Sequence, residues 1–221
     1  PKFLIMNFKD SFEYENNFYL SASVSRISKF VTHLDLFRKI SKLRGEIIEC
    51  GVFKGTSLMR WIKFRALLEN PFSRKIVAFD TFQDFPKATL RDDDVIRKKF
   101  IDEAGIKSVD IKLFKKYLEK LQLNQNIELI KGDILNTAQE YVQNRPELRI
   151  AMLNVDVDLY EPTKKSLEVF FPHLVRGGIV ILDDYGAFPG ANKAVEEYFK
   201  REDYLIEQYN FSNAISFITK K

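Results

Sequence analysis

From residue 45 onward, the chain alternates short apolar runs with segments that have the residue pattern of helices. Five of the apolar runs are predicted strands, and they cover residues 46–50, 75–80, 127–133, 149–158 and 177–184. Near-continuous apolar strands separated by helices are typical of a parallel sheet that is covered on both faces. Because crossovers between parallel strands are right-handed, a doubly wound α/β sheet is the leading topology.

The helical segments and the end of the chain complete this prediction. The helices are expected over residues 56–68, 110–122, 135–143, 162–173 and 191–201. Two last β-rich runs, 204–209 and 214–219, are separated by polar "NFSN" and predict a closing antiparallel hairpin. The expected fold is therefore a mostly parallel, seven-stranded sheet that ends in this hairpin.

The domain organisation follows from length and pattern. A chain of 221 residues suits one large α/β domain, which we expect over residues 45–221. Residues 1–44 look mainly helical in their second half and are expected to form an amino-terminal cap. This aromatic-rich region could also supply the interface of a homo-oligomer. The connection 81–109 is long, charged and weakly periodic, and it is a candidate lid.

Composition excludes several classes of function. No apolar run reaches the roughly 18 residues that span a bilayer, so we expect no membrane partner. The net charge is +4 and basic clusters lie beside acidic ones, which argues against a nucleic-acid partner. The single cysteine, Cys50, fits a reducing compartment, which we take to be the cytoplasm. His33 and His173 lie far apart in sequence, and a His-rich metal site is therefore not expected.

The first predicted strand runs into the glycine-containing turn "ECGVFKGTS". Gly51 and Gly55 let the backbone turn tightly and approach a ligand, with Thr56 and Ser57 at the start of the next helix. A simple strand-to-helix turn explains the same residues, and the spacing departs from G-x-G-x-x-G. The turn is consistent with ligand binding but does not establish it.

The next two strands also end in polar residues. Asp80 ends the second strand, where a carboxylate can accept hydrogen bonds from both ribose hydroxyls of a nucleoside, although a helix cap is the alternative. Gly132 and Asp133 end the third strand, where an adenine ring could be held, although a turn is equally consistent. Polar residues at three successive strand ends together favour a ligand that contains adenosine.

The fourth and fifth strands both end in aspartates. Asp156 and Asp158 are two residues apart on a strand, so their side chains point to the same face, and Asp183 and Asp184 end the neighbouring strand. Adjacent strands lie about 4.8 Å apart, so these carboxylates would converge and repel one another unless they are protonated or hold a cation. All-oxygen ligation suits Mg²⁺. Helix caps and a solvated rim are the alternative interpretation.

Three segments in the same order resemble the macrocin O-methyltransferase (TylF-type) family. They are "GEIIECGVFKGTSLM", "VAFDTFQDFP" and "DVDLYEPTKKSLEVFFPHLVRGGIVILDDYGAFPGANKAVEEYF", and the likeness covers about residues 25–205. Residues 19–30 resemble the family's segment ahead of the first strand, which helps to close over the cofactor. The resemblance implies a Rossmann-like class I methyltransferase fold. It also implies S-adenosylmethionine and Mg²⁺ as cofactors, and a sugar or nucleotide-sugar as the small-molecule acceptor.

The resemblance also assigns roles to residues at the strand ends. Glu49, Gly51 and Ser57 would line the methionine end of the cofactor. Asp80 would hold the ribose, and Gly132 with Asp133 would flank the adenine. The metal ligands would be Asp156, Asp183 and Asp184, with Asp156 also bordering the cofactor. Either Asp156 or Asp158 would be the catalytic base. Apart from the resemblance, the start of the candidate lid, "FQDFP", offers Phe82 and Phe85 as covers for the cofactor, whereas packing against the sheet is the alternative. The family often has two adjacent glycines where this chain has Lys54 and Gly55.

Three other classes of protein share parts of this pattern. A Mg²⁺-dependent phosphatase of the haloacid dehalogenase type has a D-x-D motif and a later Asp pair, but its motif ends the first strand and not the fourth. A nicotinamide oxidoreductase is suggested by Tyr160 and Lys164, although Pro162 lies between them and G-x-G-x-x-G is missing. A non-catalytic binding protein would be expected to lack some of the carboxylates, and none is missing here.

Overall fold

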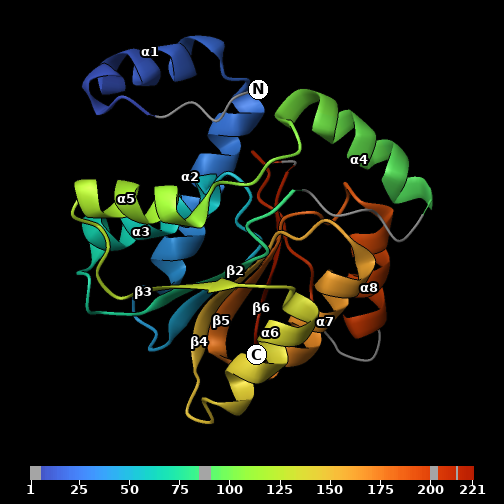
Figure 1. Ribbon diagram of the computed structural model, residues 1–221. Coiled ribbons are helices and arrows are strands. Elements are labelled where there is room, and N and C mark those ends of the chain that lie inside the picture. The colour runs from blue at the N-terminus through green and yellow to red at the C-terminus, as the bar shows by residue number, and fades with distance from the viewer. Residues whose placement is uncertain (1–5, 85–90, 200–203, 213) are drawn as a thin grey trace.

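The computed structural model describes residues 6–84, 91–199, 204–212 and 214–221, and these form an α/β fold around one sheet (Figure 1). The sheet has the strand order β3-β2-β1-β4-β5-β6. Its strands are β1 (Glu46–Cys50), β2 (Ile76–Asp80), β3 (Ile127–Lys131), β4 (Ile150–Val155), β5 (Leu174–Leu182) and β6 (Ser216–Thr219). The first five strands are parallel to one another, and β6 runs antiparallel to β5.

Helices cover both faces of the sheet, so the predicted doubly wound α/β fold is confirmed. The helices are α1 (Ser11–Ser21), α2 (Val24–Ile40), α3 (Thr56–Leu68), α4 (Arg91–Ala104), α5 (Ile111–Lys120), α6 (Ile134–Gln143), α7 (Tyr160–Phe170) and α8 (Pro189–Phe199). One core cluster joins α2, α3 and α5 to the sheet, and a second joins α6, α7 and α8 to its other face (Figure 1). Short 3-10 helices also occur at Phe8–Asp10, before α1, and at Phe171–His173, after α7.

The predicted seventh strand is wrong, because residues 204–209 form no strand. Glu207 makes a single antiparallel bridge with Phe217, with N–H to carbonyl distances of 2.8 and 2.9 Å. Beyond this bridge the chain turns, since the N–H of Ser212 donates to the carbonyl of Tyr209. A ladder needs several successive pairs, and here the turn begins too soon, so β6 pairs with β5 alone among the described strands.

The connection 81–109 is also more regular than its sequence pattern indicated, because it contains α4. Phe82 is 9% exposed and packs into the core of the α3 side of the sheet, so the alternative of sheet packing describes it better than a cofactor cover. Phe85 lies outside the described residues. The division into a cap over 1–44 and a catalytic domain over 45–221 stays a prediction, as does the lid. Among the described residues, no helix combines the length and apolarity that crossing a membrane requires.

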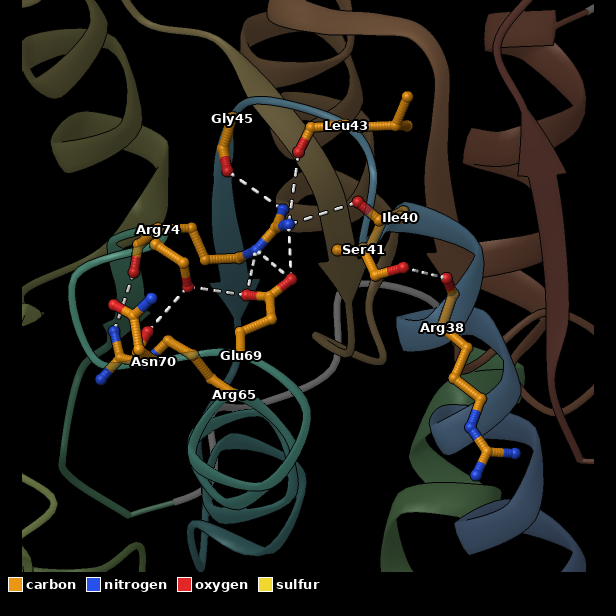
Figure 2. Close-up of polar contacts among 10 residues, drawn as sticks. Arg38, Ile40, Ser41, Leu43, Gly45, Arg65, Glu69, Asn70 and Arg74 are labelled. Atoms are coloured by element: carbon orange, nitrogen blue, oxygen red, sulfur yellow. Dashed lines mark hydrogen bonds and ion pairs between the residues drawn. The ribbon is translucent and has the colours of Figure 1, made fainter.

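A buried arginine network joins elements at the amino-terminal edge of the sheet (Figure 2). The Arg74 guanidinium donates to the carbonyls of Ile40, Leu43 and Gly45, at the end of α2 and the start of β1. Its Nη2 also lies 2.7 Å from Oε1 of Glu69, which follows α3. Both side chains are nearly inaccessible, at 3% and 8% exposure. The network therefore fixes the sheet at the edge opposite to the strand ends where the site was predicted.

Replacing Glu69 with glutamine is expected to lower the free energy of unfolding by about 2 kcal/mol, because it leaves the buried Arg74 charge without its carboxylate. Urea denaturation measures this change. The matched control is Asp35→Asn, which breaks the exposed 3.7 Å pair between Asp35 and Arg38 and should cost less than about 0.5 kcal/mol. Equal losses in the two variants would show that the Glu69–Arg74 pair has no structural role.

Candidate active site

The carboxyl ends of the parallel strands enclose a cavity of about 270 Å³, which we call the strand-end pocket. It lies where a doubly wound sheet binds its ligands. Six of the ten residues predicted from the sequence line it: Gly51, Asp80, Gly132, Asp133, Asp156 and Asp158. Residues from four separate strand ends therefore meet in one place, as predicted.

Gly51 holds the turns after β1 and β4 in direct contact. Its φ is +92°, and a Cβ built on it would lie 1.7 Å from the carbonyl oxygen of Asp156. The two turns are joined further by the N–H of Asp156, which donates to the carbonyl of Cys50 at 2.9 Å. Only glycine permits so close an approach in this backbone conformation. The contact between these two turns of the pocket thus depends on the absence of a side chain at Gly51.

The Asp80 carboxylate organises the glycine turn of the pocket. Its Oδ2 accepts hydrogen bonds from the N–H groups of Val52 at 2.7 Å and Phe53 at 2.9 Å. Its Oδ1 accepts a short hydrogen bond from the N–H of Phe82. A carboxylate has about four acceptor positions, so three internal donors leave room for one ribose hydroxyl. A contact with both hydroxyls would require the side chain to release part of this turn.

Gly132 and Asp133 form the far end of the pocket, and they also start α6. Oδ1 of Asp133 accepts from the N–H of Leu135 at 3.0 Å, which makes Asp133 the cap of this helix. Gly132 has φ +153°, and an added Cβ would lie 2.6 Å from Cγ2 of Thr137. The turn interpretation is therefore correct. It does not exclude ligand contact, because both residues line the pocket.

Glu49 and Ser57 do not line the strand-end pocket. The Glu49 side chain is fully buried, and burial raises its pKa to about 7 although its hydrogen bonds act in the opposite direction. Its carboxylate accepts hydrogen bonds from the Ser57 hydroxyl, from Nε1 of Trp61 at 2.6 Å and from Nδ2 of Asn154 at 2.9 Å. Glu49 therefore fixes the start of α3 against β4. A direct contact of Glu49 with the cofactor stays a prediction.

Four aspartates at the ends of β4 and β5, here called the acid cluster, comprise Asp156, Asp158, Asp183 and Asp184. Carboxylate oxygens of Asp156, Asp158 and Asp184 lie within 4.8 Å of one another. Burial and the neighbouring Asp156 raise the pKa of Asp158 to about 8, and burial with nearby carboxylates also raises the pKa of Asp156 and of Asp184. These acids are held together at an electrostatic cost that a bound cation would relieve.

The backbone brings Asp184 and Asp158 together. Oδ2 of Asp184 accepts from the N–H groups of Val157 at 3.1 Å and Asp158 at 2.7 Å. Asp158 has φ +61°, an uncommon conformation for a residue with a side chain. Strain of this kind is concentrated at functional sites, where the surrounding structure maintains it. The geometry is consistent with a carboxylate aimed at a ligand.

Asp183 contacts side chains of α2 and is not part of the three-carboxylate group. Its Oδ2 lies 2.6 Å from Nζ of Lys29, and its Oδ1 lies 3.9 Å from Nε2 of His33. Burial lowers the pKa of Lys29, but Asp183 and Asp156 outweigh this effect and raise it above its usual value. Burial lowers the pKa of His33, so its imidazole is neutral. Oδ1 of Asp183 and Nε2 of His33 are buried and have no hydrogen-bond partner among the described residues.

No sequence motif pointed to Lys29, and His33 was considered only as a metal ligand. Their spacing carries a signal, because residues four apart lie on the same face of a helix. Both belong to an α2 face that is otherwise packed against the sheet. Of the predicted metal ligands, the structure groups Asp156 and Asp184 with Asp158 and places Asp183 beside Lys29. The aspartates follow β4 and not β1, which argues against the phosphatase alternative.

Comparison with known proteins gives one matching family. Residues 25–210 match the family described as Macrocin-O-methyltransferase (TylF). A tetracenomycin 4'-O-methyltransferase of Streptomyces olivaceus, whose substrate carries a dimethoxy-rhamnosyl group, is 30% identical over 176 residues, which are 78% of this chain and 62% of that protein. Mycinamicin III 3''-O-methyltransferase of Micromonospora griseorubida is 27% identical over 74% of this chain and 65% of its own length. The chain thus spans less than two thirds of these relatives.

Solved structures support the same fold. CalS11, a calicheamicin methyltransferase, is 27% identical and superposes with a TM-score of 0.76 over 95% of this chain and 85% of its own. An apo structure of CalS11, described as TDP-rhamnose 3'-O-methyltransferase, gives a TM-score of 0.68 at 25% identity over 97% and 86% of the two chains. The O-methyltransferase NovP, at 20% identity over 88% of this chain and 80% of its own, has a TM-score of 0.74 and shows the fold alone.

Proposed function

Because the chain belongs to the macrocin O-methyltransferase (TylF) family, we propose that it methylates a sugar hydroxyl of a small molecule. The methyl donor would be S-adenosylmethionine, and a divalent cation, Mg²⁺ in the first instance, would assist. The observation that carries this proposal is the strand-end pocket, in which Gly51, Asp80 and Asp133 adjoin two members of the acid cluster. A nucleoside-type ligand and a cation site would then share one wall.

The residues of the strand-end pocket fit the donor. S-adenosylmethionine, when bound, supplies a methyl group on a positively charged sulfur. Gly51 leaves open a space that a Cβ would fill, and the carboxylates of Asp80, Asp133 and Asp156 give the pocket a negative lining that suits a cation. Asp80 would bind the ribose through its remaining acceptor position, and Gly132 with Asp133 would flank the adenine.

The acid cluster fits a hard divalent cation. Three carboxylates meet within 4.8 Å, and the buried Oδ1 of Asp183 lacks a hydrogen-bond partner among the described residues. Oxygen-only ligand sets of this type suit Mg²⁺. Asp156 and Asp184 would hold the ion with Asp158 beside it, and Asp183 could join them if it leaves Lys29. A cation at this place would supply positive charge that makes a sugar hydroxyl more acidic.

Asp158 is the group in the acid cluster best suited to take the proton of the acceptor hydroxyl. A free aspartate has a pKa near 3.9 and is a weak base, whereas burial and the charge of Asp156 raise the pKa of Asp158 to about 8 when no cation is bound. A base with a pKa near the working pH is the most effective. Asp158 would accept the hydroxyl proton while the acceptor oxygen bonds to the methyl carbon and the carbon–sulfur bond breaks. Asp156 and Asp184 would keep the acceptor oxygen in line with the methyl carbon and the sulfur.

Methyl transfer from labelled S-adenosylmethionine to a panel of sugar acceptors tests this function. The panel holds free sugars, nucleotide-sugars and glycosides with apolar aglycones, each with and without a chelator. We expect a methylated sugar from at least one acceptor, and loss of that product with chelator. Release of phosphate from phosphate esters, without any methylated product, would support the phosphatase alternative and refute the proposal.

Replacing Lys29 with methionine is expected to increase the affinity for divalent cation about tenfold, because the Lys29 ammonium competes with the ion for the acid cluster. Electron paramagnetic resonance of free Mn²⁺ during titration measures this affinity directly. Without metal, the variant should unfold at a lower temperature than the parent, since Asp183 loses its partner. Lys42→Met, which removes an exposed lysine near the end of α2, is the control. Unchanged or weaker Mn²⁺ binding in Lys29→Met would show that the Lys29 ammonium does not compete with the cation for the acid cluster.

A further inference from the structure

A second and larger cavity, of about 1050 Å³, lies between α1, α3 and α5, and we call it the interhelical cavity. Each helix contributes one stripe of side chains to it. The stripes are Thr56, Met59, Arg60, Lys63 and Phe64 on α3, Phe114 and Tyr117 on α5, and Ser11, Tyr14 and Phe18 on α1. Spacings of three and four residues place each stripe on a single helix face. The opposite face of α3 carries Trp61 and Ile62 in the core.

The interhelical cavity has aromatic walls and cationic side chains. Phe30 and Phe64 lie edge to face with ring centroids 5.5 Å apart, and Phe8 contacts Tyr117 at 5.6 Å. The cations among its lining residues are Lys54, Arg60, Lys63 and Lys107, whereas the described lining includes no aspartate or glutamate. Lys63 and Lys107 are exposed, and neither belongs to an ion pair within the described part of the chain.

Two lining residues of the interhelical cavity, Phe30 and Arg60, lie near the acid cluster. Phe30 lines the cavity, and the preceding residue, Lys29, contacts Asp183. Arg60 also lines it, and burial lowers the pKa of Arg60 while the charge of Asp183 opposes this effect, which places the two side chains within electrostatic reach. Phe53 lines the strand-end pocket and the next residue, Lys54, lines the cavity. A molecule in the cavity could therefore extend to the proposed reaction centre.

We propose that the interhelical cavity binds the apolar part of the acceptor, an aromatic or polycyclic aglycone that carries one anionic group. The inference rests on the proposed function, because the sugar of the same acceptor would reach the acid cluster. Aromatic walls favour a flat apolar body, and the excess of cations favours a negative substituent. A nucleotide-sugar fits less well, since its diphosphate and ribose would leave the aromatic and apolar walls uncovered.

Two fluorescent naphthalene dyes test the cavity independently of methyl transfer. The anionic dye is 1-anilinonaphthalene-8-sulfonate, and its uncharged analogue is N-phenyl-1-naphthylamine. Both are titrated into protein that is saturated with S-adenosylhomocysteine, so that the strand-end pocket is blocked. Met59→Trp fills the cavity and should weaken both dyes at least about tenfold, since displaced apolar contact is lost. Leu67→Trp, on the same helix but 75% exposed and outside the cavity, should leave both affinities within about twofold.

The charge requirement is tested by a double variant, Lys63→Met with Lys107→Met. It should weaken the anionic dye about fivefold, because two partly screened attractions are removed. It should leave the uncharged dye unchanged. Lys42→Met, which removes a lysine outside the cavity, should change neither affinity. Equal effects on the two dyes in the double variant would refute an anionic ligand.

The remaining outcomes separate this inference from the proposed function. If S-adenosylhomocysteine binds normally but the Met59→Trp substitution leaves both dye affinities unchanged, the cavity assignment alone is overturned. Failure of S-adenosylhomocysteine to bind would instead contradict the methyltransferase proposal. Sedimentation of the parent protein as a dimer that binds neither dye, with a Met59→Trp variant that becomes monomeric, would show that a second copy covers this face. That result would also overturn the inference.

Discussion

Replacing Asp156 with asparagine is expected to reduce kcat/KM for methyl transfer about a thousandfold, which corresponds to several kcal/mol of lost stabilisation by the cation. Asp156 lines the strand-end pocket and contributes an oxygen to the three-carboxylate group. Asparagine preserves the size of the side chain and removes only its charge. Mn²⁺ binding, followed by electron paramagnetic resonance, should weaken in parallel with the activity.

A loss of folding cannot account for this expected result. Burial and neighbouring acids raise the pKa of Asp156, so its ionised form opposes folding at neutral pH. The metal-free Asp156→Asn protein should therefore be at least as stable to urea as the parent. Asp35→Asn, on the exposed side of α2, is the matched control and should retain full activity. Near-normal turnover of Asp156→Asn in the presence of chelator would refute the proposed cation site.

Replacing Gly51 with alanine is expected to lower the free energy of unfolding by about 4 kcal/mol, because a steric clash adds to backbone strain. The added Cβ would lie 1.7 Å from the carbonyl oxygen of Asp156, so the turns after β1 and β4 must separate. Because both turns line the strand-end pocket, binding of S-adenosylhomocysteine should be lost as well. Urea denaturation and calorimetry measure the two effects.

Gly186 provides a control that separates strain from clash. It has φ +94°, close to that of Gly51, but a Cβ built on it would meet no atom within 4 Å. Gly186→Ala should therefore cost about 1 kcal/mol, from strain alone. If Gly51→Ala and Gly186→Ala were equally stable, the contact between the β1 and β4 turns would not be essential to the pocket.

The sequence was sufficient to predict the fold and the location of the pocket because both depend on local patterns. Each parallel strand is an apolar run, and each ends at the same edge of the sheet, so Gly51, Asp80 and Gly132 could be assigned to one region. The spacing of two between Asp156 and Asp158 likewise placed their side chains on one face. The prediction of a seventh strand was wrong, because Glu207 has strand-like neighbours in sequence but pairs only through a single bridge.

The contacts within the site were less predictable because they depend on packing between distant segments. Adjacent residues point to opposite faces of a strand, and the pairing of Val155 with Leu182 sets which of the next two aspartates meets Asp156 and Asp158. Asp183 then faces α2 and contacts Lys29, which lies 154 residues away in sequence. The hydrogen bonds of Asp80 to Val52 and Phe53 also join separate turns, so no local pattern revealed them.

Calorimetric titration with S-adenosylhomocysteine, with and without Mg²⁺, tests the central claim most directly. We expect one molecule bound per chain in both conditions, with binding lost in Gly51→Ala, and a separate Mg²⁺ binding event that Asp156→Asn removes. A folded parent protein that takes up no S-adenosylhomocysteine in either condition would refute the proposed methyltransferase function.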